Sequence, residues 1–535
     1  MEEIGVIVLE EVNLHEIFQT GFFLILIAAG ITAIAKKVKQ PYPIALVIVG
    51  AIIGLLNIPL LEPLKMFITE GEIFNFVIIT LFLPALLGEA ALKLPFSHLK
   101  ENKEPILALA FGGTLLSFLL IGFTAHYFLG LSLPAAFVFG ALMSATDPVS
   151  VLSIFKSVGV KKRLAVVIEG ESLFNDGLAV VLFKISALSL ITYLDAGWSG
   201  LGMGLWDFIR VVSLGLIIGG ALGYGFSLLT KYFDDYPLEI IFSILLFYGS
   251  FLIAESVHAS GVIAVVVAAL IFGNFGSSIG MTPTTKLNIN NFWDVAALLA
   301  NSIVFLMIGL EITRIDMQDK WEIIFIAIIL VLIARSVAVY ASMSVIRDFS
   351  MNWKHILNWG GLKGSLSIAL VLSLPRDFQG REELLILAFS VVLFSLVLQG
   401  LTIKPLISFL GINKKEEVYF EYEQLLSKIH RYETAMKEMM EAKGRYYLTK
   451  TITDEYVQKY QQKLEIAIAE MEELYRRKPE LKEKQTETLR RVVFYAEHEA
   501  VDKLSMEEII SSETAEKERK ELTEALVNLS HEKEG

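Results

Sequence analysis

Acidic side chains stand inside some of the most apolar stretches of this chain. The densest group is the run that holds Glu171, Ser172, Asn175 and Asp176, and a second site is Asp147. On a helix, residues four apart share a face, so Ser172 and Asp176 present a hydroxyl and a carboxylate to one point. A charged group near the centre of a bilayer costs at least about 2.5–3.5 kcal/mol on insertion scales. Charges that a sequence keeps there indicate a functional site.

The chemistry that these groups suit is the binding of a small cation. Such an ion needs several hard oxygen ligands when it loses its water. Pro148 interrupts the helical hydrogen bonds beside Asp147, so a carbonyl near Thr146 is left free. We predict that this carbonyl, with Asp147, Ser172 and Asp176, forms a Na+ site. A proton and a cation would compete for its carboxylates, which is sufficient to couple their movements. The alternative is that both aspartates only pair with polar groups of neighbouring helices.

Other charged residues in apolar stretches have different expected roles. Arg335 stays protonated, and Glu171 on another helix could be its partner in a scaffold pair. Lys363 could support the end of a broken helix, pair with a carboxylate, or take part in transport. Glu89, at the inner end of its predicted span, could attract cations to a cytoplasmic funnel or be solvated at the interface. Glu255 lies near a span end and is interpreted as interfacial.

These residues need a scaffold of membrane-spanning helices. The chain has 535 residues, of which 54% are hydrophobic and 19% are charged. Soluble domains carry about a quarter charged residues, so a large part of this chain must avoid water. Up to Gly411 the sequence is a series of apolar stretches near the length that a helix needs to cross the hydrocarbon core. We predict about thirteen spans: 16–35, 43–61, 73–93, 105–128, 132–155, 164–194, 205–232, 237–257, 259–275, 292–312, 321–345, 355–375 and 383–409.

The charges in short loops predict the orientation of the spans. Basic residues follow the first, third and fifth spans: Lys36, Lys37, Lys39, Lys100, Lys103, Lys161, Lys162 and Arg163. We therefore expect the N-terminus outside and the C-terminal tail in the cytoplasm. Thirteen spans divide as six, one and six, which allows an inverted repeat of six helices. Transporters of this kind place broken helices at equivalent positions, here at 146–148 in the fifth span and 360–365 in the twelfth.

The composition also excludes several classes of function. The chain has no Cys, so disulfides and Cys-based metal or redox sites are excluded. Its net charge of −12 comes mainly from a hydrophilic tail and does not indicate binding to nucleic acid. No P-loop is present, so the proton gradient is the expected energy source and no cofactor is expected. We predict a transmembrane domain at residues 1–411 and a helical cytoplasmic tail at residues 412–535.

At these residues the chain resembles the NhaP-type sodium/proton antiporters, the branch that also includes the animal sodium/hydrogen exchangers. The matching segments keep the family order over about residues 15–411. They are Phe82–Glu89, Ala145–Pro148, Gly170–Gly177, His258–Val262, Gly309–Glu311, Trp359–Gly364 and Gln399–Thr402. Thr-Asp-Pro alone is a weak signal, but its combination with Glu-Ser-x-x-Asn-Asp in the correct order is specific.

The resemblance implies a thirteen-helix homodimer whose core domain moves like an elevator against a dimerisation domain. It makes Asp176 the main ion-binding carboxylate. It adds as further ligands Asp147, Ser172, Glu89 and the backbone of Thr146. It makes Asn175 the residue that orders the crossing helices. Asn175, in place of a second aspartate, also implies electroneutral exchange of one cation for one proton.

Two positions depart from the family pattern. Lys363 stands where the family usually has Arg, so the charge is kept but the planar fork of the guanidinium is lost. Gly88 stands where the family usually has Phe before Glu89, and we expect this to widen the inner entrance. Neither change removes a predicted ion ligand.

The tail from residue 412 is rich in charges of both signs. Its periodicity predicts helices at about 456–477 and 489–510, with Pro479 as a break. Such a segment could simply be a solubilising tail. The alternative is a regulatory domain that senses pH, a ligand or a partner.

The sequence therefore predicts an electroneutral antiporter that exchanges Na+, or Li+, for H+ across the cell membrane. Exchange of K+ on the same scaffold is the nearest alternative. An intramembrane aspartyl protease would also use two buried aspartates, but the Tyr-Asp and Gly-x-Gly-Asp motifs of such enzymes are missing. A passive cation channel is a third class, which a cation current at fixed pH would reveal.

Overall fold

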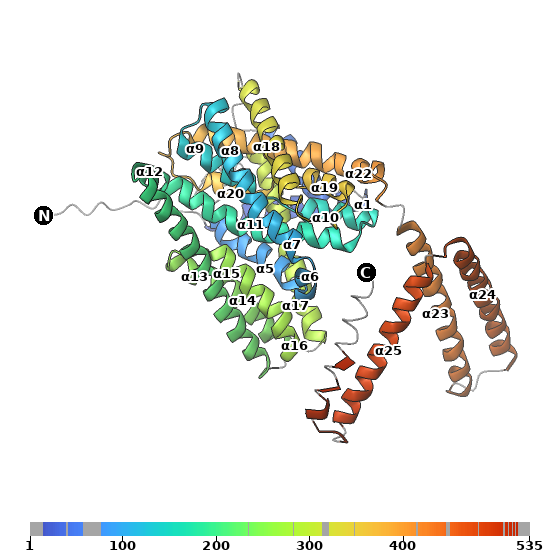
Figure 1. The fold of residues 1–535 in the computed structure, drawn as a ribbon. Helices are drawn as coiled ribbons and strands as arrows, with labels where there is room; N and C mark the ends of the chain where they lie inside the picture. The colour runs from blue at the N-terminus through green and yellow to red at the C-terminus, as the bar shows by residue number, and fades with distance from the viewer. Residues whose placement is uncertain are drawn as a thin grey trace. The chain divides into compact units, whose positions relative to one another are not determined.

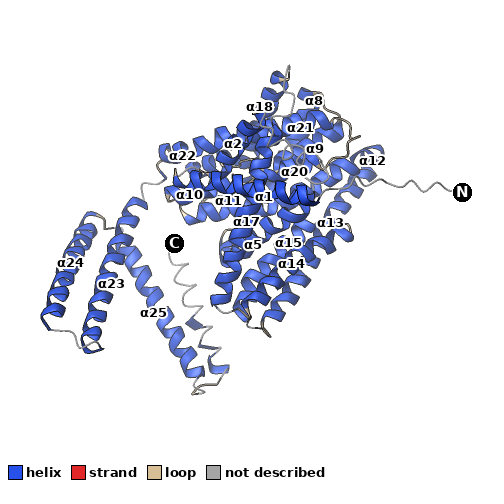
Figure 2. Ribbon diagram, turned by 180° about the vertical axis from the view of Figure 1, so that it is seen from behind, coloured by secondary structure: helices blue, strands red, loops and turns tan. Residues whose placement is uncertain are grey.

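The chain is almost entirely helical. The computed structural model describes residues 14–38, 41–56, 76–233, 235–281, 283–312, 320–346, 348–412, 416–445, 450–479, 481–506 and parts of 509–522. Within these residues every regular element is a helix (Figures 1 and 2), which confirms the predicted all-α fold. The contacts divide the chain into two compact units, Met1–Asn413 and Lys414–Gly535.

The first unit has the helices of a multi-pass membrane protein. Eight helical stretches among the described residues are long and apolar enough to cross a bilayer. They are Lys103–Leu129, Leu133–Lys156, Trp198–Thr230, Tyr236–Ser256, Gly261–Ile279, Thr285–Leu310, Trp321–Ser342 and Arg381–Phe409. Helix α11 (Lys162–Leu188) has 27 residues but carries the charged residues of the predicted site. The predicted count of about thirteen crossings, and the repeat, stay predictions.

The elements of the first half run from α1 to α11, where η marks a π-helical segment. They are α1 (Leu14–Lys37), α2 (Tyr42–Leu55), η2 (Phe76–Phe82), α5 (Leu83–Lys93), α6 (Phe96–Glu101), α7 (Lys103–Leu107), η3 (Ala108–Gly113), α8 (Thr114–Leu129), α9 (Leu133–Ser144), α10 (Val149–Val158) and α11. Helices α2, α5 and α9 have proline as their second residue, where its missing N–H costs no helical hydrogen bond: Pro43, Pro84 and Pro134.

The second half of the unit continues from α12 to α22. Its elements are α12 (Leu190–Asp195), α13 (Trp198–Thr230), α14 (Tyr236–Ser256), α15 (Gly261–Ile271), η4 (Phe272–Gly276), α16 (Ser277–Ile279), α17 (Pro283–Ile312), α18 (Trp321–Ser342), α19 (Met351–Trp359), α20 (Ser365–Leu372), α21 (Arg381–Phe394), η5 (Ser395–Gln399) and α22 (Gly400–Phe409).

Every predicted span overlaps a helical stretch, with three clear differences in extent. The span predicted to begin at residue 205 begins at Trp198. The span predicted to begin at residue 292 begins at Pro283, because polar residues continue the helix beyond its apolar part. The span predicted at 164–194 ends as α11 at Leu188, and the short helix α12 follows it. Residues 57–61 and 73–75 of two predicted spans, together with Lys39, lie outside the described residues.

The helices of the first unit pack as two groups. One group contains α1, α2, α5 and α13 to α17, and the other contains α7 to α11 and α18 to α22. Figure 1 shows α13 to α17 together in one part of the unit and α8, α9, α18 and α20 in another. Helix α11 packs against α9 in its own group and against α5, α13 and α15 in the other. It therefore lies where the two groups meet.

Two glycines allow α2 and α17 to approach each other closely. A Cβ atom on Gly50 would lie 2.6 Å from the carbonyl oxygen of Leu306. A Cβ atom on Gly309 would overlap the carbonyl oxygen of Val47. Small residues at such contacts let helix backbones pack directly in a membrane. Both sites therefore require glycine for steric reasons.

The second unit begins with a helical hairpin and continues in a third helix. Helices α23 (Glu416–Arg445) and α24 (Lys450–Arg477) pack on each other, and α25 spans Leu481–Met506. Their small apolar core contains Tyr422, Leu425, Met471, Leu474 and Leu481. Helix α24 covers the predicted helix at 456–477, and α25 covers most of the one at 489–510. The predicted helices of the tail do not include α23, although its apolar residues have helical spacing.

We predict that Gly309→Ala destabilises the membrane unit. The added methyl group meets backbone atoms of α2 that cannot move aside, and overpacking of this kind costs about 1–3 kcal/mol. The control is Gly249→Ala on α14, where an added Cβ atom has no neighbour within 4 Å. Unfolding curves in detergent measure both variants. Equal melting temperatures for the two would contradict the close contact.

Candidate functional site

Two helices are broken in the middle of the unit, and their breaks cross. Helix α9 ends at Ser144 and α10 begins at Val149, and residues 145–148 between them belong to no helix. Helix α19 ends at Trp359 and α20 begins at Ser365, with residues 361–364 extended. The N–H of Asp147 donates to the carbonyl oxygen of Leu362 at 2.7 Å, which joins the two segments. Both breaks lie where the sequence predicts them.

Local sequence explains why the chain leaves the helix at these points. The ring of Pro148 disfavours a helical conformation at Asp147. A Cβ atom on Gly364 would overlap the side chain of Asp147, and one on Gly361 would lie 2.6 Å from Nε of Arg335. The glycines therefore make room for the charged side chains that the crossing brings together.

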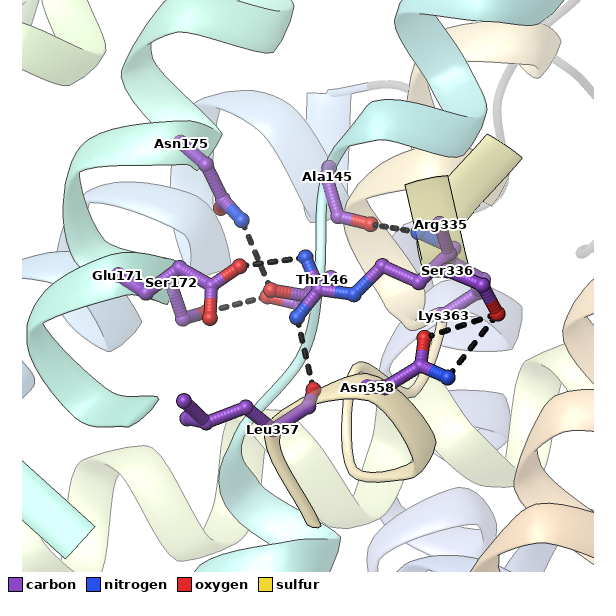
Figure 3. A network of polar contacts seen from close by, with 10 residues as sticks. All are labelled: Ala145, Thr146, Glu171, Ser172, Asn175, Arg335, Ser336, Leu357, Asn358 and Lys363. Atoms are coloured by element: carbon purple, nitrogen blue, oxygen red, sulfur yellow. Dashed lines mark hydrogen bonds and ion pairs between the residues drawn. The ribbon is translucent and has the colours of Figure 1, made fainter. Parts of the chain in front are cut away.

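Cations neutralise the C-terminal ends of both half-helices at the crossing (Figure 3). Lys363 Nζ donates to the carbonyl oxygen of Ala145, just after α9, at 3.0 Å. Arg335 Nη2 donates to the carbonyl oxygen of Leu357, in the last turn of α19, at 3.0 Å. These carbonyl groups carry the negative end of the helix dipole. Lys363 therefore supports a broken-helix end, one of the roles that the sequence left open.

Arg335 and Glu171 form a buried ion pair. Arg335 Nη1 donates to Glu171 Oε1 at 2.5 Å, and the two side chains are only 7% and 3% exposed. Glu171 belongs to α11 and Arg335 to α18. The guanidinium thus joins three elements, α11, α18 and the end of α19, with two of its nitrogens held in one rigid plane.

Helix α11 holds the segment 145–148 through Thr146. Ser172 donates to the carbonyl oxygen of Thr146, and Asn175 Nδ2 donates to its Oγ1 at 2.8 Å. Figure 3 shows Ser172 and Asn175 both directed at Thr146. The Oδ1 atom of Asn175 is buried and has no hydrogen-bond partner among the described residues. Asn175 therefore links α11 to the crossing.

A cavity of about 520 Å³ lies beside the crossing. The five residues that the sequence predicts as ion ligands all line it: Glu89, Thr146, Asp147, Ser172 and Asp176. Asp147 Oδ1 accepts a hydrogen bond from the N–H of Val149 at 2.9 Å, so the start of α10 orients this carboxylate. These five residues bring three carboxylates, two hydroxyls and the backbone of Thr146 to one cavity.

The cavity wall also contains residues that sequence reasoning did not assign. They are Lys36, Tyr42, Lys156, Glu169, Asp294 and Asn301. Asn301 is a polar residue inside the predicted span 292–312, and this signal could have identified it. Tyr42 resembles an ordinary aromatic residue at a membrane interface, so nothing in the sequence distinguished it.

Glu89 reaches the cavity with a partner of its own. Lys93, one turn later on α5, donates to Glu89 Oε1 at 2.6 Å and also pairs with Asp294 on α17. The carboxylate of Glu89 is about a quarter exposed, with a side-chain exposure of 23%. An ion that binds Glu89 would have to compete with the ammonium group of Lys93.

Gly88 does not widen the inner entrance, so that expectation is wrong. The ring of Phe247, from α14, fills the space that a side chain at Gly88 would need. Phe247 is fully buried and packs on Trp293 with 4.6 Å between ring centroids. An aromatic ring from another helix thus replaces the one that the family usually carries at this position.

The donor set suits a hard monovalent cation better than a transition metal. Among the described residues no three of His, Cys, Asp and Glu come together in a metal-binding group. Oxygen atoms of mixed charge remain, from Asp147, Asp176, Ser172 and Thr146. Hard cations bind such oxygens. The same carboxylate oxygens can bind a proton instead.

Comparisons with known proteins agree with this geometry. Residues 23–409 match the family model described as sodium/hydrogen exchanger, transmembrane. The chain is 66% identical over 523 residues to the Na+/H+ antiporter NhaG of Bacillus atrophaeus, which covers 98% of this chain and all of that protein. It is 53% identical over 398 residues to the Na+/H+ antiporter NhaH of Halobacillus dabanensis, covering 74% of this chain and 99% of that protein.

A solved structure has the same fold. The sodium proton antiporter MjNhaP1 from Methanocaldococcus jannaschii superposes with a TM-score of 0.60 at 23% sequence identity. The match covers 74% of this chain and 99% of that one.

We predict that Arg335→Met destabilises the protein by about 3–5 kcal/mol, because it leaves Glu171 buried without a partner. The double variant Arg335→Met with Glu171→Leu should lose less stability, since no lone charge remains. The control is Lys184→Met, which removes the partly exposed pair between Lys184 and Glu255, at 2.6 Å, and should cost less than Arg335→Met. Unfolding in detergent measures these differences. If Arg335→Met were as stable as the double variant or more stable, the ion pair would not act as a scaffold.

Proposed function

The chain belongs to the transmembrane sodium/hydrogen exchanger family, in its NhaP-type branch, and exchanges Na+ for H+ across a membrane; we propose that both ions compete for the carboxylates of Asp147 and Asp176. The observation that carries this mechanism is that both aspartates line one cavity at the crossing of two broken helices. The family model matches most of the membrane unit.

The cation is held by the two carboxylates together with the hydroxyl of Ser172 and the carbonyl of Thr146. In this structure Ser172 donates to that carbonyl. An arriving Na+ ion would replace this hydrogen bond, because both oxygens have lone pairs that can turn to the ion. Asn175 keeps its own hydrogen bond to Thr146 and so holds the segment in place. Glu89 is a further ligand or an entry site, shared with Lys93.

The exchange is electroneutral, with one Na+ for one H+. Two carboxylates that bind either one Na+ or one H+ have the same net charge in both cases. The nearby Arg335 is neutralised by Glu171, and Asn175 adds no charge beside Asp176. The loaded site therefore crosses the membrane in the same charge state in both directions, so one exchange cycle moves no net charge and membrane voltage does not drive it.

The cavity opens towards the cytoplasm in the proposed topology. Its wall contains Lys36 and Lys156, which lie in the last turns of α1 and α10. Basic residues at span ends favour the cytoplasmic side. The N-terminus is then outside and the tail inside the cell, with thirteen crossings: two inverted groups of six and one crossing between them. The group that contains α9 to α11 moves against the group that contains α13 to α17, and two copies form a homodimer.

The alternatives that the sequence left open are less well supported. Exchange of K+ is not favoured, because the similar proteins are named Na+/H+ antiporters. The same names indicate a transporter and not an enzyme such as an aspartyl protease.

The tail regulates exchange and is not required for it. It has a small apolar core of its own. The Halobacillus relative matches this chain over 398 residues, which are 99% of that protein. A protein of that length has no counterpart to about a quarter of this chain and is still named an antiporter. The Bacillus relative matches 98% of this chain, so it includes the tail.

We expect Na+ to drive proton movement in proteoliposomes that contain this protein and a pH-sensitive dye. Asp176→Ala should abolish the signal, and Asp147→Asn should do the same, because each removes a carboxylate from the site. Asp377→Ala, at an exposed loop position, is the control and should keep normal activity. An imposed membrane potential should leave the wild-type rate unchanged. Full activity of Asp176→Ala, or a voltage-dependent rate, would exclude this mechanism.

Removal of residues 414–535 should leave Na+/H+ exchange intact but change its dependence on pH or its maximal rate. The physical reason is that every proposed ligand lies in the first unit. Dye dequenching over a range of pH values compares the truncated and full-length proteins. Identical pH profiles and rates would argue against a regulatory tail, and complete loss of exchange from folded protein would show that the tail is essential.

A further inference from the structure

Ser395 lies behind the crossing, on the side away from the ion cavity. It is the first residue of the π-helical segment η5, it is 1% exposed, and it is not part of the wall of the 520 Å³ cavity. It lines instead a much smaller space together with Arg335, Gly361, Lys363 and Gln399. Ser395 therefore cannot touch a cation bound between Asp147 and Asp176.

One peptide group connects Ser395 to Asp147. The N–H of Lys363 donates to Ser395 Oγ at 2.9 Å. The carbonyl of Leu362, which belongs to the same peptide group, accepts the N–H of Asp147 at 2.7 Å. Because a peptide group is planar and rigid, its two ends cannot turn independently. The hydroxyl of Ser395 thus fixes the direction of the carbonyl that holds Asp147.

The extended segment depends on such a partner. Residues 361–364 have left the helix, so their N–H groups lose their helical partners; Leu362 donates to the carbonyl oxygen of Gly360 at 2.9 Å, and Lys363 needs an acceptor from another element. The side chain of Ser395 supplies an acceptor at the middle of this segment. The π-helical geometry of η5 contributes, because an extra residue in the turn redirects the side chains that follow, and such turns are common at functional sites.

The other crossing segment is held by the same kinds of residue. Ser172 and Asn175 of α11 bind Thr146 in the first segment. Ser395 binds Lys363 at the second segment, and Gln399 donates to the carbonyl oxygen of Trp359, which precedes it, at 3.4 Å. In both cases an adjacent helix contributes a serine and a side-chain amide. Ser172 of the first pair lines the ion cavity, and neither residue of the second pair does.

We propose that Ser395 is a positioning residue for Asp147, acting through the Leu362–Lys363 peptide group. Loss of its hydroxyl lets that peptide group rotate, and the backbone of Asp147 then loses its fixed acceptor. The carboxylate moves relative to Asp176, so the cation is bound more weakly. This inference rests on the proposed role of Asp147 as an ion ligand.

The experiment compares Ser395→Ala with a matched control in proteoliposomes. Ser186→Ala removes another serine hydroxyl that is 1% exposed and has no hydrogen-bond partner among the described residues. We expect Ser395→Ala to raise the Na+ concentration for half-maximal exchange about tenfold, the upper end of the effect of losing one hydrogen bond between uncharged groups. The maximal rate should change less than about threefold. Ser186→Ala should leave both quantities close to wild type.

A conservative variant separates positioning from general damage. Ser395→Thr keeps the hydroxyl, so its Na+ concentration for half-maximal exchange should lie within about threefold of the wild-type value. Ser395→Cys has only a weak acceptor, so its value should lie between those of Ser395→Thr and Ser395→Ala. Melting temperatures confirm that each variant is folded. The proposal is overturned if Ser395→Ala leaves the Na+ concentration for half-maximal exchange unchanged, or if Ser186→Ala raises it equally. It is also overturned if Ser395→Thr is folded and needs as much Na+ as Ser395→Ala.

The same assay distinguishes this inference from the proposed function. The proposed function fails if wild type shows no Na+-driven proton movement or if Asp147→Asn keeps it. The inference alone fails if wild type exchanges, Asp147→Asn does not, and Ser395→Ala behaves like the control Ser186→Ala.

Discussion

Backbone groups that leave a helix inside a bilayer have no water to bind, and the site is built around this constraint. Residues 145–148 and 361–364, at the centre of the unit, belong to no helix. They bind one another through Asp147 and Leu362 and through Lys363 and Ala145, and neighbouring elements supply further partners from Ser172 and Ser395. The polar contacts that make two broken helices stable in lipid are therefore the same contacts that place the carboxylates.

The two cations at the crossing are not interchangeable. Arg335 binds both Glu171 and the end of α19, which needs two directions of donation from one planar group. Lys363 binds the carbonyl oxygen of Ala145, for which a point charge is sufficient. This difference explains how the chain tolerates lysine at Lys363, where the family usually has arginine. The planar guanidinium group is needed at position 335, and the chain has arginine there.

The sequence was informative where the signal is local. Asp147 before Pro148 and the glycines around Lys363 indicate broken helices, and charges in apolar stretches indicate the residues of the cavity. Partners far apart in the chain leave no such pattern. Lys363 and Ala145 are 218 positions apart, and Ser395 is an ordinary serine in an apolar helix until its contact is seen. The error at Gly88 has the same origin, because Phe247 comes from another helix.

The hydrogen bond from Ser172 to the carbonyl of Thr146 has a consequence for leakage. Because of this bond, neither of these two polar groups lacks a partner, so neither adds to the cost of moving the carrier without an ion. In the proposed mechanism that cost comes from the negative charges of Asp147 and Asp176, which are costly to move through lipid. The fixed ratio of Na+ to H+ then depends on these charges. A neutral residue in place of either aspartate would let the carrier cross the membrane more easily with no ion bound.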